Sequence, residues 1–212
     1  MKVVVTRARE DARELASRLQ AAGLEIAVCP LIETDPVGPS ELDVSGYDWV
    51  IVTSRSGARE LARRMRGRPR HVAAIGPGTA ATLRENAIEP DLVAATSTQE
   101  GLAAELPRPA GSVLFAGAED ARRVLVDELG ADFVPLYRTK ELRPADFPDG
   151  DLVVLASASA ARAYGTLGRP TPAVSIGPQT TAEARRCGVA IVAEARPHDV
   201  DGLVEAVKAA CG

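Results

Sequence analysis

The sequence predicts an α/β protein in which one unit of about 105 residues is used twice, each copy folding as a mostly parallel sheet covered by helices. Three observations lead to this prediction. Short apolar runs alternate with helical patterns along the whole chain, several motifs recur in the same order, and small or polar residues stand where each strand meets the next helix.

Four motifs carry the repeat. Asp48–Ser54 returns as Asp151–Ser157 at an offset of 103 residues, and Ala74–Pro77 returns as Ser175–Pro178 at an offset of 101. The remaining two offsets are 109 and 105 residues, for Glu10–Arg13 with Glu119–Arg122 and for Pro30-Leu31 with Pro135-Leu136. Because small loop deletions produce such slowly drifting offsets, we infer an internal duplication.

Each copy alternates strand and helix. The expected strands are short runs rich in β-branched residues, as in strands buried on both faces: Val3–Thr6, Ile26–Cys29, Trp49–Thr53, Val72–Ile75, Leu92–Ala95, Val113–Ala116, Phe133–Leu136, Leu152–Ala156, Val174–Ile176 and Ala190–Ala193. The expected helices lie between them, at Asp11–Ala22, Ala58–Met65, Thr79–Asn86, Asp120–Leu129, Thr180–Arg186 and Gly202–Ala210. Gly23 and Gly130 stand where helix C-caps are expected.

Composition excludes several classes of protein. With 46% hydrophobic and 25% charged residues, the 212-residue chain can bury a core. Its net charge of −4 argues against a general binder of nucleic acid or membrane surfaces, and the arginines between 59 and 70 are interpreted as a solvated helix face. Three cysteines without a C-x-x-C pair, no bilayer-length apolar run and no signal-peptide pattern lead us to expect a cytoplasmic protein.

The strand-to-helix junctions are candidate anion sites. In parallel sheets ligands bind beyond the carboxyl ends of the strands, where the N–H groups of helix N-termini point. Ordinary N-capping by Ser or Thr is the alternative for any single junction. The six junctions are Thr6–Arg9, Thr53–Ser56, Gly76–Thr79, Gly117-Ala118, Ser157–Ser159 and Gly177–Thr180.

Cofactor and metal motifs are weak. Gly76–Ala81 matches G-x-G-x-x-A, but no acidic residue closes the next strand, and the second copy, Gly177–Ala182, lacks the second glycine. Neither His71 nor His198 has a further ligand at metal-binding spacing. With no P-loop or nucleophile elbow either, we expect an enzyme of this sequence to use no cofactor, metal or covalent nucleophile.

Tyr137 is the strongest single candidate for a functional residue. It follows the repeated Pro135-Leu136, where the first copy has Ile32 after Pro30-Leu31. The alternative is a half-buried strand residue whose hydroxyl is hydrogen-bonded within the protein.

Together these segments resemble the uroporphyrinogen-III synthase family almost from end to end. The resemblance rests on the order and duplication of Val5-Thr6-Arg7, Pro30–Glu33, Val52-Thr53-Ser54, Ala74–Pro77, Pro135–Thr139, Ile176–Thr180 and Asp201-Gly202-Leu203. It implies two Rossmann- or flavodoxin-like lobes that grip a substrate between them. One lobe would comprise residues 1–34 and 141–212 and the other 36–138, joined by linker strands near 30–36 and 135–141.

The resemblance also implies a reaction. Hydroxymethylbilane, a linear tetrapyrrole handed over by porphobilinogen deaminase, would lose its hydroxyl and close to uroporphyrinogen III with its last ring inverted. Tyr137 matches the tyrosine proposed to assist departure of the hydroxyl, although a phenol, with an ordinary pKa of about 10, is a weak acid. The residues expected to bind the substrate's carboxylates are Arg7, Thr53, Ser54, Ser56, Gly78, Thr79, Ser157, Ser159, Gln179 and Thr180.

The sequence departs from the family at several junctions. The family's Thr-Ser-Pro-Ser reads Thr53-Ser54-Arg55-Ser56 in the first copy and Ala156-Ser157-Ala158-Ser159 in the second, and Gln179 replaces a common threonine. A non-catalytic relative that senses a tetrapyrrole is the alternative to an enzyme. We expect a monomer that binds neither nucleic acid nor membranes.

Overall fold

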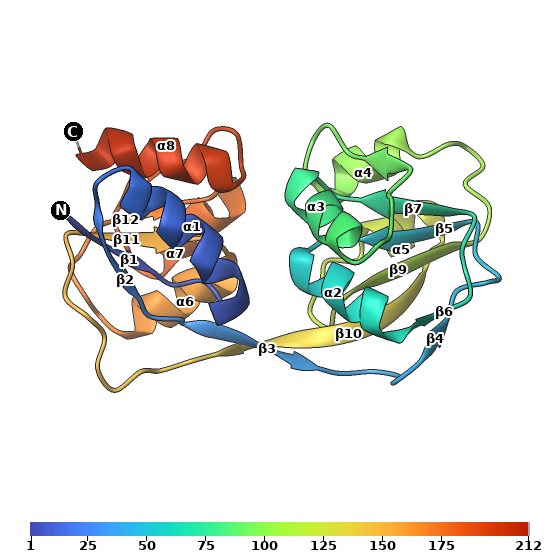
Figure 1. Cartoon of the computed structure of the whole chain (residues 1–212), viewed down its shortest axis with the longest axis horizontal. Helices are drawn as coiled ribbons and strands as arrows, with labels where there is room; N and C mark the ends of the chain where they lie inside the picture. The colour runs from blue at the N-terminus through green and yellow to red at the C-terminus, as the bar shows by residue number, and fades with distance from the viewer. Residues whose placement is uncertain (212) are drawn as a thin grey trace. The chain divides into compact units, whose positions relative to one another are not determined.

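The computed structural model describes residues 1–211 (Figure 1). Two compact units make up this chain, one formed by Met1–Glu33 together with the segment from Lys140 onward, the other by Thr34–Thr139. The chain passes from one unit to the other twice, within β3 (Ile32–Pro36) and within β10 (Asp132–Glu141), which are hydrogen-bonded neighbours. We call the discontinuous unit the first unit and the other the second unit.

The first unit is a five-stranded parallel sheet in the order β13-β12-β11-β1-β2. Its alternating side chains fill two separate cores. Val3 and Val5 pack with one pair of helices, α1 and α8, and Val4 packs with α6 and α7 on the other face. The bounds are β1 (Lys2–Val5), α1 (Arg9–Ala21), β2 (Glu25–Val28), β11 (Leu152–Leu155), α6 (Ala158–Thr166), β12 (Ala173–Ser175), α7 (Pro178–Arg186), β13 (Ile191–Glu194) and α8 (Val200–Cys211).

The second unit repeats this arrangement. Its sheet has the order β3-β10-β9-β5-β7-β8, with β5, β7, β8, β9 and β10 parallel. Val50 and Val52 pack with α2 and α3, and Trp49 and Ile51 pack with α4 and α5. The bounds are β4 (Leu42–Asp43), β5 (Trp49–Val52), α2 (Arg55–Arg64), β6 (Met65–Arg66), β7 (His71–Ala74), α3 (Pro77–Glu85), β8 (Leu92–Val93), α4 (Gln99–Glu105), β9 (Val113–Ala118) and α5 (Val124–Leu129).

The two sheets have the same strand arrangement, but the chain forms their strands in a different order. By the repeated motifs, β11, β12 and β13 correspond to β5, β7 and β8, while β1 and β2 correspond to β9 and β10, and the spatial order then agrees strand for strand. The predicted α/β fold with parallel sheets is therefore confirmed. In each unit the chain builds outward in both directions from one point, between β5 and β9 or between β1 and β11, and this is where such sheets bind ligands.

The largest differences between the expected and the observed elements concern α5, β10 and α4. The helix expected at Asp120–Leu129 begins only at Val124, after a turn in which Ala121 N–H donates to the Ala118 carbonyl. The strand expected at Phe133–Leu136 continues to Glu141, because its second half pairs with β3 instead of β9. The helix α4 was not expected; its N-cap Thr98 accepts a hydrogen bond from Gly101 N–H.

Glycine follows two helices as expected, since Gly23 after α1 and Gly130 after α5 are in the left-handed conformation, with φ of 84° and 64°. Within residues 1–211, no helix combines the length and the apolar character that a membrane crossing requires.

Candidate functional site

One serine in each unit stands at the carboxyl end of a central strand. Ser54 follows β5 and caps α2, accepting a hydrogen bond from Gly57 N–H at 2.9 Å. Ser157 follows β11 and caps α6 in the same way, accepting from Ala160 N–H at 3.1 Å. Both serines have φ of −162° and ψ of 158°, so the duplicated sequence builds one local geometry twice. Both stand where the strand order reverses.

Tyr137 meets Ser54 in the second unit. The hydroxyl oxygens of the two residues are 2.8 Å apart, and either can donate. A β-bulge directs Tyr137 to this position: Pro135 pairs with Gly117 and Tyr137 with Ala118, so Leu136 is the extra residue. Only 8% of Tyr137 is exposed, and its ring belongs to the core that includes α2. The phenol is thus held by packing and by a hydrogen bond beside a helix N-terminus.

The other predicted residues of the second unit lie at the starts of α2 and α3. Thr53 and Ser56 are half-buried on either side of Ser54 and Arg55. Gly78, in the first turn of α3, lies under the guanidinium of Arg55, since a Cβ built on Gly78 would be 3.0 Å from Arg55 Nε. Thr79 is buried. The structure therefore brings Thr53, Ser54, Ser56 and Tyr137 to one end of the sheet, with Arg55 linking α2 to α3.

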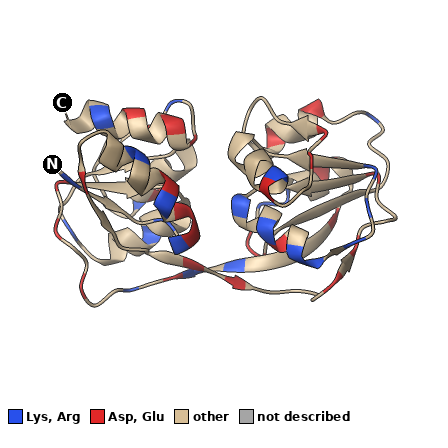
Figure 2. Cartoon of the chain, in the orientation of Figure 1, with Lys and Arg blue, Asp and Glu red and all other residues tan. Residues whose placement is uncertain are grey.

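Basic side chains are concentrated on α2. This helix carries Arg55, Arg59, Arg63 and Arg64 (Figure 2). Arg59 Nη2 lies 3.4 Å from Ser56 Oγ, one turn earlier on the helix. The arginines between 59 and 70 were interpreted from the sequence as a solvated helix face, but Arg64 is buried. Arg55 directly follows Ser54 in the chain and Arg59 contacts Ser56, so both arginines bring positive charge to the part of α2 that Ser54 caps.

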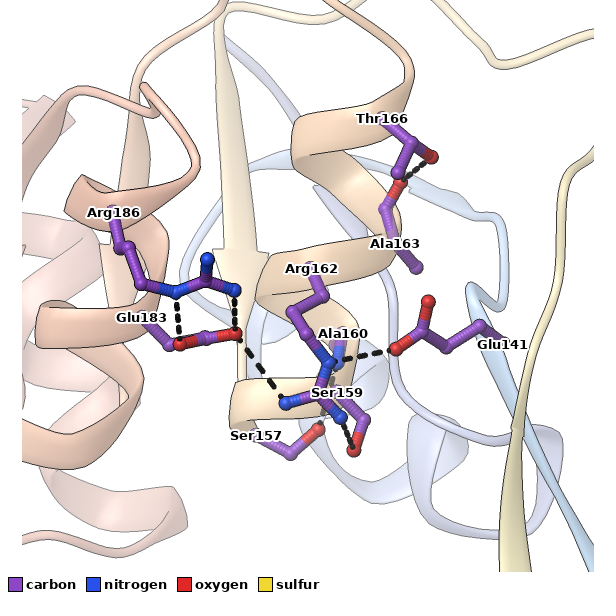
Figure 3. A network of polar contacts seen from close by, with 9 residues as sticks. All are labelled: Glu141, Ser157, Ser159, Ala160, Arg162, Ala163, Thr166, Glu183 and Arg186. Carbon is purple, nitrogen blue, oxygen red and sulfur yellow. Dashed lines mark hydrogen bonds and ion pairs between the residues drawn. The ribbon is translucent and has the colours of Figure 1, made fainter.

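The first unit contains the corresponding serine–arginine pair within a larger network (Figure 3). Arg162 Nη2 donates to Ser159 Oγ at 3.2 Å, as Arg59 does to Ser56. Glu141 and Glu183 approach the same guanidinium from two sides, at 2.9 and 3.4 Å. Burial lowers the pKa of Arg162, but the hydrogen bonds to these carboxylates outweigh it, so the net shift is upward.

Glu183 is the most strongly shifted carboxyl group of this network. Arg186 donates to it through Nε at 3.0 Å and Nη2 at 2.8 Å. These hydrogen bonds, together with the charges of Arg186 and Arg162, lower the pKa of Glu183 from 4.5 to about 2. The carboxylate is therefore ionised at every physiological pH and keeps Arg162 oriented.

The remaining predicted residues of the first unit are spread along the same edge. Arg7 follows β1 and forms an ion pair with Asp11 at 3.9 Å. Gln179 is exposed in the first turn of α7, whereas Thr180 beside it is buried. His198 lies over the start of α7, because a Cβ on Gly177 would be 3.2 Å from its ring. The structure thus does not group Gln179 with Thr180 at the surface.

Two of the arginines described above were not predicted from the sequence. Ser56 and Ser159 were predicted to bind the substrate but Arg59 and Arg162 were not, although both pairs have the spacing Ser-x-x-Arg and recur at the offset of 103 residues. Comparing the two copies residue by residue would have found them. Among residues 1–211, no group of three or more His, Cys, Asp or Glu side chains is arranged to hold a metal ion.

Comparisons with known proteins agree with one another. A protein family described as uroporphyrinogen-III synthase HemD matches residues 13–205. A putative uroporphyrinogen-III synthase of Methanocaldococcus jannaschii is 30% identical over a segment that covers 66% of this chain and 63% of that protein. The uroporphyrinogen-III synthase of Synechococcus elongatus is 24% identical over 97% of this chain and 94% of its own length.

Solved structures support the fold. The uroporphyrinogen-III synthetase of Helicobacter pylori aligns with a TM-score of 0.69 and 18% identity, covering 99% of both chains. A mutant uroporphyrinogen III synthase of Thermus thermophilus aligns with a TM-score of 0.58 and 16% identity, covering 100% of this chain and 98% of its own.

Proposed function

Since this chain belongs to the uroporphyrinogen-III synthase family, we propose that it converts hydroxymethylbilane to uroporphyrinogen III. The linear tetrapyrrole loses its hydroxyl as water and closes with its last pyrrole ring inverted. The reaction is a step of tetrapyrrole biosynthesis, which leads to haem, sirohaem and cobalamin.

The observation that carries this proposal is the Ser54–Tyr137 pair. Its two hydroxyl groups lie 2.8 Å apart at the point where the strand order of the second unit reverses. Ser54 Oγ accepts a hydrogen bond from Gly57 N–H and keeps its own hydroxyl proton. The Ser54 and Tyr137 hydroxyl groups can therefore pass one proton toward a leaving hydroxyl group. The electron-rich pyrroles of the substrate supply the electron pair that expels the hydroxyl, and no protein nucleophile is required.

Positioning accounts for the rest of the proposed catalysis. Direct closure without ring inversion gives the type I isomer, so the protein must hold the reacting ends of the bilane in one geometry. The substrate's eight carboxylates suit the helix N-termini at Ser54 and Ser157 and the cations Arg55 and Arg59. Thr53, Ser56, Ser159 and Gln179 supply further hydrogen-bonding groups at the same edges.

Four narrower points belong to the same proposal. The substrate is received from porphobilinogen deaminase, the protein acts as a monomer, it works in the cytoplasm, and no cofactor takes part. Each can be tested separately from the reaction itself.

A coupled assay tests the proposed reaction. Porphobilinogen deaminase supplies hydroxymethylbilane in the presence and absence of this protein, and the oxidised porphyrin products are separated by isomer. We expect type III to dominate when the protein is present. Type I alone, with tetrapyrrole binding still measurable, would instead identify a non-catalytic relative.

A further inference from the structure

A buried ion pair contacts β10, the strand that carries Tyr137. Glu60 and Arg64 are one turn apart on α2, and their side chains are only 11% and 10% exposed. Arg64 Nη2 donates to Glu60 Oε2 at 2.6 Å. The same guanidinium donates to three backbone carbonyls, those of Val37, Pro39 (3.2 Å) and Leu136 (2.9 Å). Both Nη atoms of Arg64 are therefore hydrogen-bonded inside the protein.

The contact with Leu136 links this ion pair to the candidate site. Leu136 is the extra residue of the β-bulge, and its carbonyl accepts hydrogen bonds from Val37 N–H at 3.0 Å and from Arg64. That carbonyl shares a rigid peptide plane with the nitrogen of Tyr137. Arg64 consequently fixes the orientation of the peptide from which the Tyr137 side chain departs.

The duplicated unit provides an internal comparison. At an offset of 103 residues, Arg64 corresponds to Leu167 and Glu60 to Ala163 in the first unit. At the offset of 105 residues given by the Pro-Leu repeat, Tyr137 corresponds to Ile32. The first unit thus forms the same sheet without the ion pair and without the tyrosine. The ion pair occurs together with the tyrosine and is not required by the fold.

Energetics favour the same interpretation. A buried ion pair often contributes little net stability, because desolvation of the two charges offsets their attraction, and apolar residues can replace it. The first unit shows such a replacement at the corresponding positions. What Arg64 adds beyond apolar packing is directional hydrogen bonding to the bulge.

We propose that Arg64, held by Glu60, is a positioning residue that sets the Tyr137 hydroxyl on Ser54 for the reaction. The inference rests on the proposed role of Tyr137 in that reaction. Arg64 itself contacts backbone and Glu60, so it acts only through Tyr137.

The test replaces the ion pair by the residues of the first unit. The variant Glu60→Ala/Arg64→Leu leaves no lone buried charge, and we expect its unfolding midpoint to stay close to that of the wild type. Its kcat for type III formation should fall roughly ten- to hundredfold, with KM changed less than about threefold, because the reacting group is displaced while the binding groups remain. Arg66→Leu, which removes an exposed arginine paired with Glu41, is the matched control and should leave both constants unchanged.

The same two substitutions made in the Tyr137→Phe protein test whether Arg64 affects the reaction through Tyr137. In the Tyr137→Phe protein, Glu60→Ala/Arg64→Leu should lower kcat no further. An equal loss in both backgrounds, or no loss in either, would overturn the proposal. Should the double variant fail to fold, Arg64→Lys replaces it in the same comparison, since lysine keeps the charge opposite Glu60 but not the planar fork.

A structural readout separates this inference from the proposed function. The chain has three tyrosines, so ¹³C-tyrosine NMR resolves them by Tyr→Phe assignment. Loss of the ion pair should shift the Tyr137 signal and leave those of Tyr47 and Tyr164 in place. An unmoved Tyr137 signal would refute the positioning role whatever the activity. A wild-type protein that forms no type III product would instead refute the proposed function, and the NMR result would stand.

Discussion

Removing the Ser54 hydroxyl is expected to delete two interactions at once. Ser54 caps α2 through Gly57 N–H and contacts the Tyr137 hydroxyl. Loss of a serine N-cap costs about 1 kcal/mol and loss of one partly buried hydrogen bond about 1 kcal/mol, so Ser54→Ala should lower the free energy of unfolding by about 2 kcal/mol. Of these two interactions Tyr137→Phe removes the second, and the loss of that hydrogen bond is expected to cost about 1 kcal/mol.

The free energy of unfolding of the double variant shows whether the two hydroxyl groups interact. Ser54→Ala/Tyr137→Phe deletes the same two interactions as Ser54→Ala alone, so its expected loss is about 2 kcal/mol and the coupling between the two sites is about 1 kcal/mol. Urea unfolding followed by the fluorescence of Trp49 measures this directly, because Trp49 is the single tryptophan and lies buried in β5, which leads into Ser54.

An additive result would refute this reasoning. If the double variant loses about 3 kcal/mol, the sum of the single losses, the hydroxyls of Ser54 and Tyr137 do not interact in solution. Ser157→Ala supplies the control, since it removes the corresponding cap of α6 in the other unit, where Ile32 replaces the tyrosine. Measured by far-UV circular dichroism, Ser157→Ala and Tyr137→Phe should show no coupling.

Two further predictions concern stability. Glu183 has its folded-state pKa lowered to about 2 from 4.5, so its ionised form stabilises the protein above pH 4.5 and this contribution disappears as the pH falls from 4.5 to about 2. The difference in Tm between wild type and Glu183→Gln should shrink across that window; a difference that stays constant would contradict it. In the family motif Asp201-Gly202-Leu203, a Cβ on Gly202 would clash with the Pro197 carbonyl, so Gly202→Ala should lower the free energy of unfolding by about 1–3 kcal/mol. Gly46→Ala, with open space around it, should have no such effect in urea unfolding, and equal losses for the two variants would refute the steric argument.

The fold was largely predictable from the sequence because the duplication is visible in it. Buried parallel strands need apolar, β-branched residues on both faces, and this composition placed all the central strands of both sheets. The errors fell where local pattern does not decide. The extension of β10 to Glu141 depends on pairing with β3, and the late start of α5 depends on a turn after β9.

The candidate site was less predictable. Serines at helix starts could be found because capping is a local property of the sequence. The partners of the arginines could not be predicted, because they are distant in the sequence. Arg64 contacts Val37 and Leu136. Arg162 contacts Glu141 and Glu183. The burial of Thr79 and Thr180 likewise follows from tertiary packing.

The rate of type III formation by Tyr137→Phe tests the central claim most directly. Tyr164→Phe is its matched control, because Tyr164 is also buried and also donates one hydrogen bond, to the Thr171 carbonyl at 2.9 Å. The account predicts a fall of about a hundredfold or more for Tyr137→Phe, as expected when a proton-donating group is lost, and a change below about threefold for Tyr164→Phe. A Tyr137→Phe protein that forms uroporphyrinogen III at the wild-type rate would contradict it.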